Sequence, residues 1–264
     1  MSGVAAEMPA KFGLMLDGCS FDSEHYIAVY GYYNFNGKAQ YPLLTMAPLV
    51  ADPSAHHSAA SPVNFLREML MRDYSKRLDD CLFVVGDNCA TNQRMATLVG
   101  VPLVGCASHR LSLAVQGRFS KASDDLDQVK KLMTKLKGLN QSAKLRFKTP
   151  LRPFINDDDT LADSLPSPPA NRRLCKFLDD LSKIESVSKE LQSSSVSLLD
   201  ARVYFDGLLE LHPSFSTHLS PRAPSVHSPH FEAACVKVLV GKADELTGGQ
   251  RATSLRPFVV EDLS

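Results

Sequence analysis

The sequence predicts an α/β protein in which a mixed β-sheet is followed by a mainly helical region. In the first half of the chain, short apolar runs rich in β-branched residues alternate with segments of helical periodicity. Two of these runs lead into the aspartates Asp17 and Asp87, and a third leads into Cys106-Ala107-Ser108-His109. Beyond residue 120 leucines recur at helical spacing and strand patterns disappear.

The composition is that of an ordinary globular protein. Of the 264 residues, 44% are hydrophobic and 22% are charged, which suits one large domain or two smaller ones. No apolar run is long enough to span a bilayer and the amino terminus lacks a signal-peptide pattern, so we expect an intracellular protein with no membrane partner. The six scattered cysteines predict reduced thiols. Lys+Arg and Asp+Glu balance at 29 each, which argues against strong DNA binding.

Three strands are predicted near the amino terminus. Residues 12–16 form an apolar run that ends at Asp17, and residues 25–33 are rich in β-branched and aromatic side chains. The segment 34–38 contains Asn-Gly, which is typical of a hairpin turn. Residues 41–50 form the third strand, and its prolines favour the edge of a sheet. The short connections predict an antiparallel meander.

A helix, a buried strand, a second helix and a short strand follow. The preceding loop contains His56-His57, which we assign to solvent rather than to a metal site. Apolar residues at helical spacing predict a helix over 62–77, and the apolar run 82–85 predicts a buried strand. A helix near 91–99 and a strand at 103–104 complete the series. This order of elements is that of a ribonuclease H-like fold with a mixed sheet.

Asp87 stands at the carboxyl end of the predicted buried strand, within Gly86-Asp87-Asn88. Binding sites in open α/β sheets lie beyond the carboxyl ends of strands, so Asp87 could act there with Asn88 and Thr91 beside it. The alternative is that Asp87 caps the helix that follows. The residues by themselves leave both interpretations open.

The second half of the chain is predicted to be helical, with helices over 120–150 and 174–210 and an amino-terminal cap at Ser197-x-x-Asp200. The predicted domains are a core at 1–118, a basic helical segment at 119–156, a linker at 157–172, a helical region at 173–246 and a disordered tail at 247–264. The basic segment supplies candidate phosphate-binding residues, with a solvated helix face as the alternative. They are Lys130, Lys131, Lys135, Lys144, Arg146 and Lys148.

Three motifs resemble the conserved blocks of hAT superfamily transposases, over most of the chain from Phe12 to about Lys237. Phe12-Gly-Leu-Met-Leu-Asp17-Gly resembles the first catalytic block. Val84-Val-Gly-Asp87-Asn-Cys-Ala-Thr-Asn92 resembles the second block, Asp-Asn-Ala-x-Asn, with one residue inserted. Gly105-Cys106-Ala-Ser-His109-Arg-Leu-Ser-Leu resembles the Cys-x-x-His block, which is the most specific of the three.

The resemblance implies a ribonuclease H-like catalytic core interrupted by a helical insertion domain. It implies that Asp17 and Asp87 are catalytic ligands of Mg²⁺ or Mn²⁺, and that Asn88, Cys106 and His109 support the motif. It also implies a nuclear protein with DNA and related transposase chains as partners. We expect no zinc at Cys106 and His109, because no second Cys/His pair stands at matching spacing.

The chain also departs from the family. Cys19 stands where the first block often has Trp, Leu161-Ala162 follows Asp159-Thr160 where Arg-Trp is usual, and the sequence contains no Trp. We expect no zinc finger ahead of the first block and no carboxyl-terminal dimerisation region.

The third acidic residue of the family is also expected to be missing, because Glu232, Glu245 and Glu261 lie on segments unlike the one that carries it. We therefore expect a truncated, transposon-derived remnant without catalytic activity and with at most weak nucleic-acid binding. One alternative is a metal-dependent, DNA-cleaving transposase. Another is a small-molecule α/β enzyme that uses Asp87 with Cys106 and His109.

Overall fold

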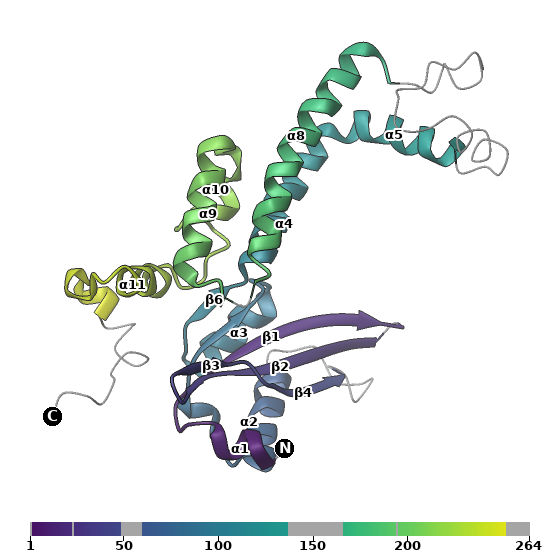
Figure 1. Cartoon of the computed structure of the whole chain (residues 1–264). Helices are drawn as coiled ribbons and strands as arrows, with labels where there is room; N and C mark the ends of the chain where they lie inside the picture. The colour runs from purple at the N-terminus through teal and green to yellow at the C-terminus, as the bar shows by residue number, and fades with distance from the viewer. Residues whose placement is uncertain (1, 23, 49–59, 137–165, 194, 252–264) are drawn as a thin grey trace. The chain divides into compact units, whose positions relative to one another are not determined.

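The computed structural model describes residues 2–22, 24–48, 60–136, 166–193 and 195–251 (Figure 1). These residues form two compact units. The larger unit comprises the residues up to 113 together with those from 191 onward, and the smaller unit comprises residues 114–190. No helix in the described ranges is long and apolar enough to cross a membrane.

The larger unit is built on a six-stranded mixed sheet with the order β3-β2-β1-β5-β6, in which β4 also pairs with β2. The strands are β1 (Phe12–Phe21), β2 (Glu24–Phe35), β3 (Lys38–Gln40), β4 (Leu43–Pro48), β5 (Cys81–Gly86) and β6 (Leu103–Gly105). The pairs of β2 with β1, β3 and β4 are antiparallel, whereas β1–β5 and β5–β6 are parallel. The predicted α/β class and mixed sheet are confirmed.

The predicted meander differs in one detail: the predicted third strand corresponds to β4, and the short strand β3 precedes it. β3 follows a tight turn in which Asn36 and Gly37 both have positive φ, 52° and 75°, as a type I′ hairpin turn requires. β4 begins at Leu43, directly after Pro42. Proline has no N–H to donate to a ladder, which explains why the pairing is interrupted there.

The helices of the larger unit lie between and after the strands. Those before and between strands are α1 (Ser2–Glu7), α2 (Ala60–Tyr74) and α3 (Ala90–Val99), and α4 (Ala107–Phe119) begins in this unit. Those after residue 190 are α9 (Leu198–Leu211), α10 (Ser216–Leu219) and α11 (Pro229–Leu239). The predicted helices at 62–77 and 91–99 are confirmed by α2 and α3. Gly100 ends α3 in the left-handed conformation, with φ of 77°.

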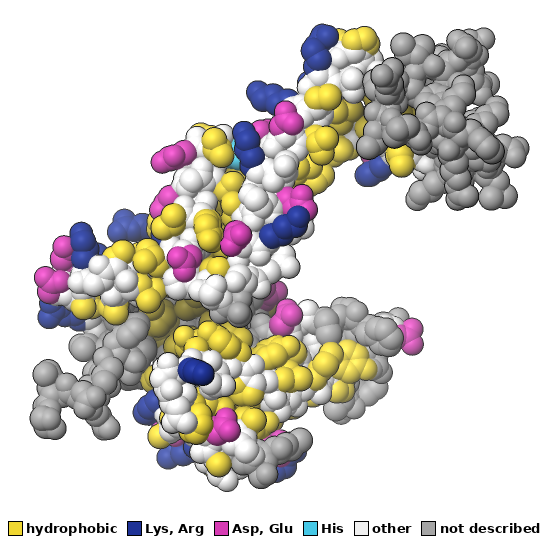
Figure 2. All heavy atoms as spheres, viewed as in Figure 1, with side chains coloured by type: hydrophobic (Ala, Val, Ile, Leu, Met, Phe, Trp, Pro, Cys, Tyr) yellow, Lys and Arg dark blue, Asp and Glu magenta, His cyan; other side chains and the backbone are white. Residues whose placement is uncertain are grey.

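One face of the sheet packs into the core of the unit. Its buried strand residues alternate along the chain, as period-two patterning predicts, and contact buried residues of α2. They include Phe12, Leu14, Leu16, Ile27 and Val29 from strands and Leu66, Met69 and Leu70 from α2. The opposite face carries the intervening residues, such as half-buried Tyr30 and Tyr32 and exposed Leu43 and Met46. Figure 2 shows apolar side chains gathered over the strands of this unit.

The predicted helix over 174–210 is broken, because α8 ends at Glu190 and α9 begins at Leu198. The predicted cap at the start of α9 is confirmed. The Ser197 hydroxyl accepts a hydrogen bond from the Asp200 N–H at 3.2 Å, and the Asp200 carboxylate accepts one from the Ser197 N–H at 2.8 Å. This reciprocal arrangement is a capping box.

The smaller unit contains the end of α4 with α5 (Ser123–Leu136) and α8 (Pro168–Glu190). The Phe119 and Phe177 rings meet edge to face with centroids 5.2 Å apart. Arg173 donates two hydrogen bonds to the Asp125 carboxylate, at 2.7 and 2.6 Å. These contacts join helices that lie far apart in the sequence.

This division differs from the predicted domains. The predicted boundaries at 118 and 172 fall inside α4 and α8, because an amphipathic helix continues through the proline-rich start of α8. Residues from 191 onward belong to the unit that contains the sheet, rather than to a separate helical domain. The part of the predicted tail at 247–251 is packed, since the Lys237 Nζ donates to the Gln250 Oε1 at 3.2 Å. The predicted linker residues 157–165 and tail residues 252–264 lie outside the described residues.

Candidate functional site

Asp17 lies on β1, and Asp87 is the first residue after the neighbouring parallel strand β5, which ends at Gly86. The register pairs Leu14 with Val84 and Met15 with Val85, so continuing it by two residues, past the end of β5, brings Asp87 level with Asp17. Backbones of adjacent strands lie about 4.8 Å apart. Asp17 is exposed and Asp87 is half-buried. That the two carboxylates share one metal ion stays a prediction, but the register satisfies its first requirement.

Asp17 does not end its strand, contrary to the sequence prediction. β1 continues to Phe21, and Asp17 pairs with Ala28 of β2. The pairing of Phe21 with Glu24 across a tight turn extends the hairpin past the point where the apolar run stops. The strand end is therefore decided by a neighbouring strand and not by local composition.

The loop after β5 is held by two amide side chains from the first turn of α3. The Asn92 Nδ2 donates to the carboxylate of Asp87 and, at 3.2 Å, to its backbone carbonyl. The Gln93 Nε2 donates to the Asn88 carbonyl at 2.8 Å. Gly86 leaves room for this arrangement, because a Cβ there would lie 3.2 Å from the Asn92 Nδ2. Asp87 is thus presented in a defined orientation at the end of the strand.

The helix cap of α3 is Cys89, so the interpretation of Asp87 as that cap is wrong. The Cys89 Sγ accepts a hydrogen bond from the Asn92 N–H at 3.4 Å, whereas Asp87 binds the Asn92 side chain. Burial and the neighbouring Asp87 carboxylate raise the pKa of the Cys89 thiol. A thiol that keeps its proton is a poor nucleophile.

The predicted support residues lie around Gly105. The Cys106 N–H donates to the Gly86 carbonyl at 2.7 Å, and Cys106 and His109 are half-buried near the start of α4. The Asn88 amide is packed against Gly105, where any Cβ would overlap it. Both polar atoms of that amide are buried and have no hydrogen-bond partner in the described part of the chain. Asn88 therefore fills space between β5 and β6 rather than facing solvent.

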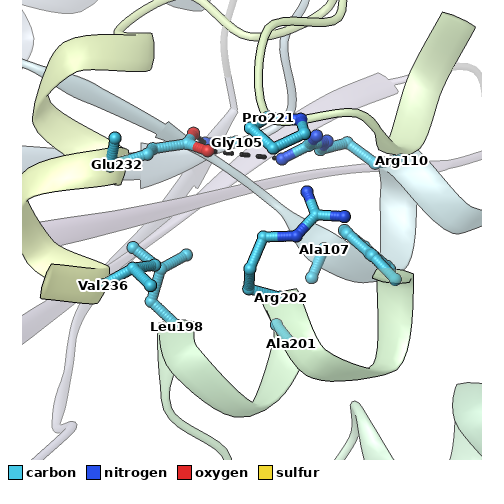
Figure 3. A pocket seen from close by; sticks show the side chains of 11 residues that line it. Gly105, Ala107, Arg110, Leu198, Ala201, Arg202, Pro221, Glu232 and Val236 are labelled. Atoms are coloured by element: carbon cyan, nitrogen blue, oxygen red, sulfur yellow. Dashed lines mark hydrogen bonds and ion pairs between the residues drawn. The ribbon is translucent and has the colours of Figure 1, made fainter. Parts of the chain in front are cut away.

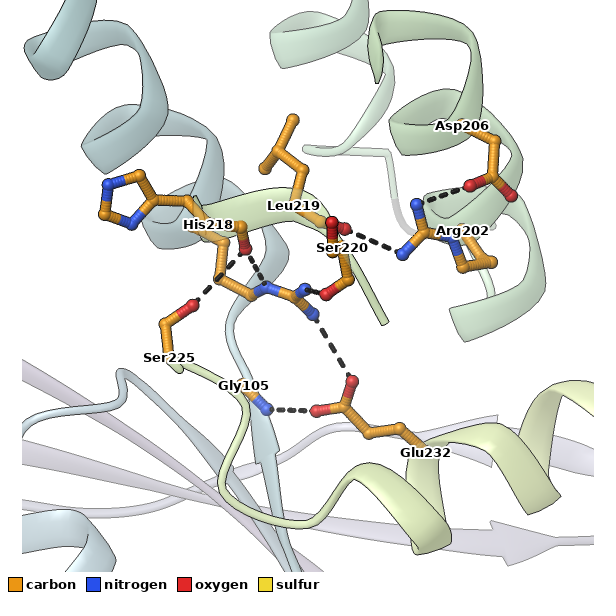
Figure 4. A network of polar contacts seen from close by, with 9 residues as sticks. Gly105, Arg202, Asp206, His218, Leu219, Ser220, Ser225 and Glu232 are labelled. Carbon is orange, nitrogen blue, oxygen red and sulfur yellow. Dashed lines mark hydrogen bonds and ion pairs between the residues drawn. The ribbon is translucent and has the colours of Figure 1, made fainter. Parts of the chain in front are cut away.

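Arg110 and Glu232 form a buried ion pair at the end of β6 that the sequence analysis did not anticipate (Figure 3). The Arg110 Nη1 lies 3.3 Å from the Glu232 Oε2, and the two side chains are only 4% and 9% exposed. Arg110 also donates to the His218 and Ser220 carbonyls, each at 3.0 Å, and Glu232 accepts from the Gly105 N–H at 3.1 Å (Figure 4). No spacing rule relates residues 122 positions apart, so only the fold reveals the pair.

Burial dominates the titration of this pair. It raises the pKa of the Glu232 carboxyl, against the opposing effects of the Gly105 N–H and of Arg110. It also lowers the pKa of the Arg110 guanidinium, against the attraction of Glu232. Both carboxylate oxygens of Glu232 accept hydrogen bonds within the unit, from the Gly105 N–H and from Arg110.

The donor set at Asp17 and Asp87 suits one hard cation. In the described part of the chain no three His, Cys, Asp or Glu residues gather where they could hold a metal ion. Glu232 is ion-paired with Arg110, and the Glu245 Oε1 lies 3.5 Å from the Lys242 Nζ. Glu261 is outside the described residues. Mg²⁺ is often held by only one or two carboxylates, with water and phosphate oxygens as the other ligands. The residues described here fit that arrangement and not a two-metal clamp.

The predicted phosphate-binding residues are only partly described. Lys130 and Lys131 are exposed on α5, and Lys135 lies on the same helix. The Lys130 Nζ lies 3.3 Å from the Asp127 carboxylate, an exposed pair that holds the side chain only weakly. Lys144, Arg146 and Lys148 lie outside the described residues, as does His56-His57.

Comparison with protein-family models finds no match, and no curated protein matches the chain. The fold and the site define the class: an α/β protein with one aspartate on a strand of a mixed sheet and a second directly after the neighbouring parallel strand.

Proposed function

We propose that this chain is a transposon-derived relative of the hAT transposases, with a ribonuclease H-like core that no longer cleaves DNA. It binds one Mg²⁺ or Mn²⁺ at Asp17 and Asp87 and binds nucleic acid weakly. DNA, and related transposase chains in the nucleus, are the partners that the proposal implies.

The strand order supports the ribonuclease H-like part of the proposal. Three consecutive strands in antiparallel pairing are followed by two parallel strands on the far side of β1. Helices α2 and α3 connect β4 to β5 and β5 to β6. This is the order of elements expected for that fold from the sequence.

The observation that carries the proposal is the level register of Asp17 and Asp87. Carboxylate oxygens are the ligands that Mg²⁺ and Mn²⁺ prefer. In two-metal phosphoryl transfer, one ion activates the attacking oxygen and the other stabilises the leaving oxygen. Two carboxylates can hold one such ion, with the Asn92 amide orienting Asp87 toward it. The loss of one metal role is the physical reason for expecting no cleavage.

Mn²⁺ binding tests the metal site directly. Titration followed by electron paramagnetic resonance is expected to show one weak site in the full chain, and Asp17→Asn and Asp87→Asn should each remove it. Asn92→Leu keeps both carboxylates but loses the donor that orients Asp87, so it should weaken Mn²⁺ binding by about tenfold. Asp79→Asn, an exposed acid of the same unit, is the matched control.

The same variants test the catalytic part of the proposal. Incubation of supercoiled duplex DNA with the wild type and Mn²⁺ is expected to give no nicking above the Asp87→Asn background. Robust nicking abolished by both aspartate substitutions would instead support a DNA-cleaving transposase. If the wild type binds no Mn²⁺, the metal site itself is refuted.

A further inference from the structure

An open pocket of about 170 Å³ lies in the larger unit, where α9 and α11 meet the start of α4 (Figure 3). Neither Asp17 nor Asp87 lines it, and the proposed function makes no use of it. Most of its wall is apolar. The carbon surface comes from Leu198, Ala201, Phe205, Pro221, Ala233 and Val236.

The size of the pocket suits a single small ring. An apolar cavity of about 150 Å³ accommodates one benzene molecule. Arg110 and Glu232 also line the pocket, but their polar atoms are bound to each other and to backbone groups. The Arg110 guanidinium lies over the Phe205 ring, 5.2 Å from its centroid. Arg110 and Glu232 are therefore not available to anchor a polar ligand.

Arg202 is the charged side chain of the pocket whose carboxylate partner a ligand can replace. Its side chain is 14% exposed, and in Figure 3 it rises from α9 between the walls. One of its nitrogens donates to the Leu219 carbonyl at 2.7 Å, and another to the Asp206 carboxylate at 2.6 Å. The Asp206 side chain is 60% exposed, and an ion pair with such an exposed partner contributes little to stability. A ligand carboxylate can therefore replace Asp206 at low cost.

The local charge favours an anion over a cation. Two arginines and one glutamate line the pocket, so the lining itself is formally positive, and the exposed Asp206 that balances Arg202 stands outside the lining. Helix α4 begins there, at Ala107, and the amino-terminal end of a helix favours negative charge, whereas the start of α9 already holds the Asp200 carboxylate. We propose that this pocket binds a small aromatic monocarboxylate, with the ring between the apolar walls and the carboxylate on Arg202.

Three probes of similar size and different charge test this assignment. Benzoate, benzyl alcohol and benzylamine are titrated into the full-length protein and followed by nuclear magnetic resonance of the backbone amides around Leu198–Phe205. Benzoate is expected to saturate with a millimolar Kd, since a ligand of about nine heavy atoms gains only a few kcal/mol. Benzyl alcohol should bind about tenfold more weakly and benzylamine weaker still.

Two variants separate the two parts of the pocket. Ala233→Leu fills the apolar space and should abolish benzoate binding, and Val236→Phe repeats this test if the first variant does not fold. Arg202→Gln keeps the apolar walls but should reduce the preference for benzoate over benzyl alcohol to near unity. Arg222→Gln, an exposed arginine of the neighbouring loop that does not line the pocket, is the matched control. The proposal is refuted by a wild type that shows no saturable benzoate shifts, by benzylamine binding as tightly as benzoate, or by pocket variants with unchanged Kd.

Discussion

At the scale of single residues, Gly105 is the position where the structure leaves least room. It ends β6, its N–H binds Glu232, and the Asn88 amide and Arg110 side chain lie against its Cα. A Cβ would overlap the Asn88 amide and lie 3.4 Å from the Arg110 Cδ. Neither neighbour can retreat easily, because Asn88 is packed between β5 and β6 and each of the three side-chain nitrogens of Arg110 donates a hydrogen bond. Packing therefore explains why the residue directly before the Cys-x-x-His motif is a glycine.

Gly105→Ala is therefore expected to lower the free energy of unfolding by about 1–3 kcal/mol through overpacking. Urea denaturation measures the effect. The matched control is Gly207→Ala in α9, where nothing lies within 4 Å of the added Cβ. That substitution should raise the free energy of unfolding by about 0.5–1 kcal/mol, because alanine favours the helix more than glycine does. Equal effects of the two substitutions would contradict the packing argument.

At the scale of elements, α11 covers the edge of the sheet. The Leu103 N–H donates to the Ser228 hydroxyl and the Gly105 N–H donates to the Glu232 carboxylate, both at 3.1 Å. These two N–H groups lie two residues apart on β6, and their acceptors lie four residues apart, at and just inside the start of α11. The spacings match, because two strand residues span about 6.6 Å and one helical turn about 5.4 Å. An exposed edge strand invites pairing with other chains, which this arrangement prevents.

Glu232→Ala removes the acceptor for Gly105 and leaves Arg110 buried without its carboxylate. Breaking a buried ion pair in this way costs about 3–5 kcal/mol of the free energy of unfolding. The double variant Arg110→Met with Glu232→Leu should recover part of that loss, because it leaves no unpaired buried charge. Urea denaturation of the three proteins provides the measurement. A double variant no more stable than Glu232→Ala would contradict this account.

Glu232 also makes the free energy of unfolding depend on pH. Burial raises the pKa of Glu232 in the folded state above its unfolded value, so the folded state binds this proton more tightly. The contribution of Glu232 to stability is therefore largest below its unfolded pKa and declines as pH rises through the folded pKa. In the double variant Arg110→Met with Glu232→Leu, the free energy of unfolding should lack this dependence on pH.

At the scale of the whole molecule, charge limits what the protein can bind. Lys+Arg and Asp+Glu balance at 29 each, so attraction to nucleic acid depends on local patches such as the exposed Lys130 and Lys131. Counterion release makes such binding steeply dependent on salt, with a slope of about −0.9 for each phosphate contacted on duplex DNA.

We expect weak, salt-sensitive binding of duplex DNA, and a Lys130→Gln/Lys131→Gln double variant should flatten the salt slope by up to about two. Fluorescence anisotropy at several salt concentrations measures both. The control is Lys176→Gln/Lys183→Gln, which removes two exposed lysines of α8 outside the predicted basic segment. An unchanged slope in the first variant would show that α5 does not contact phosphates.

The sequence by itself determined the local structure. The strands at 14–16, 27–33, 43–46, 82–85 and 103–104, the helices α2 and α3, the Asn-Gly turn and the Ser197 capping box all follow from periodicity and turn chemistry. These signals are local, because alternation, helical spacing and caps each involve residues a few positions apart. The order of the elements also predicted a mixed sheet.

The tertiary structure alone decided the rest. β1 passes beyond Asp17 because β2 pairs with it, and Cys89 caps α3 because Asn92 draws Asp87 elsewhere. The helices after residue 190 join the sheet unit through Glu232 and Arg110, which also border the pocket. The Arg110–Glu232 contact joins side chains 122 positions apart, and its energy depends on burial and geometry that exist only once the chain has folded.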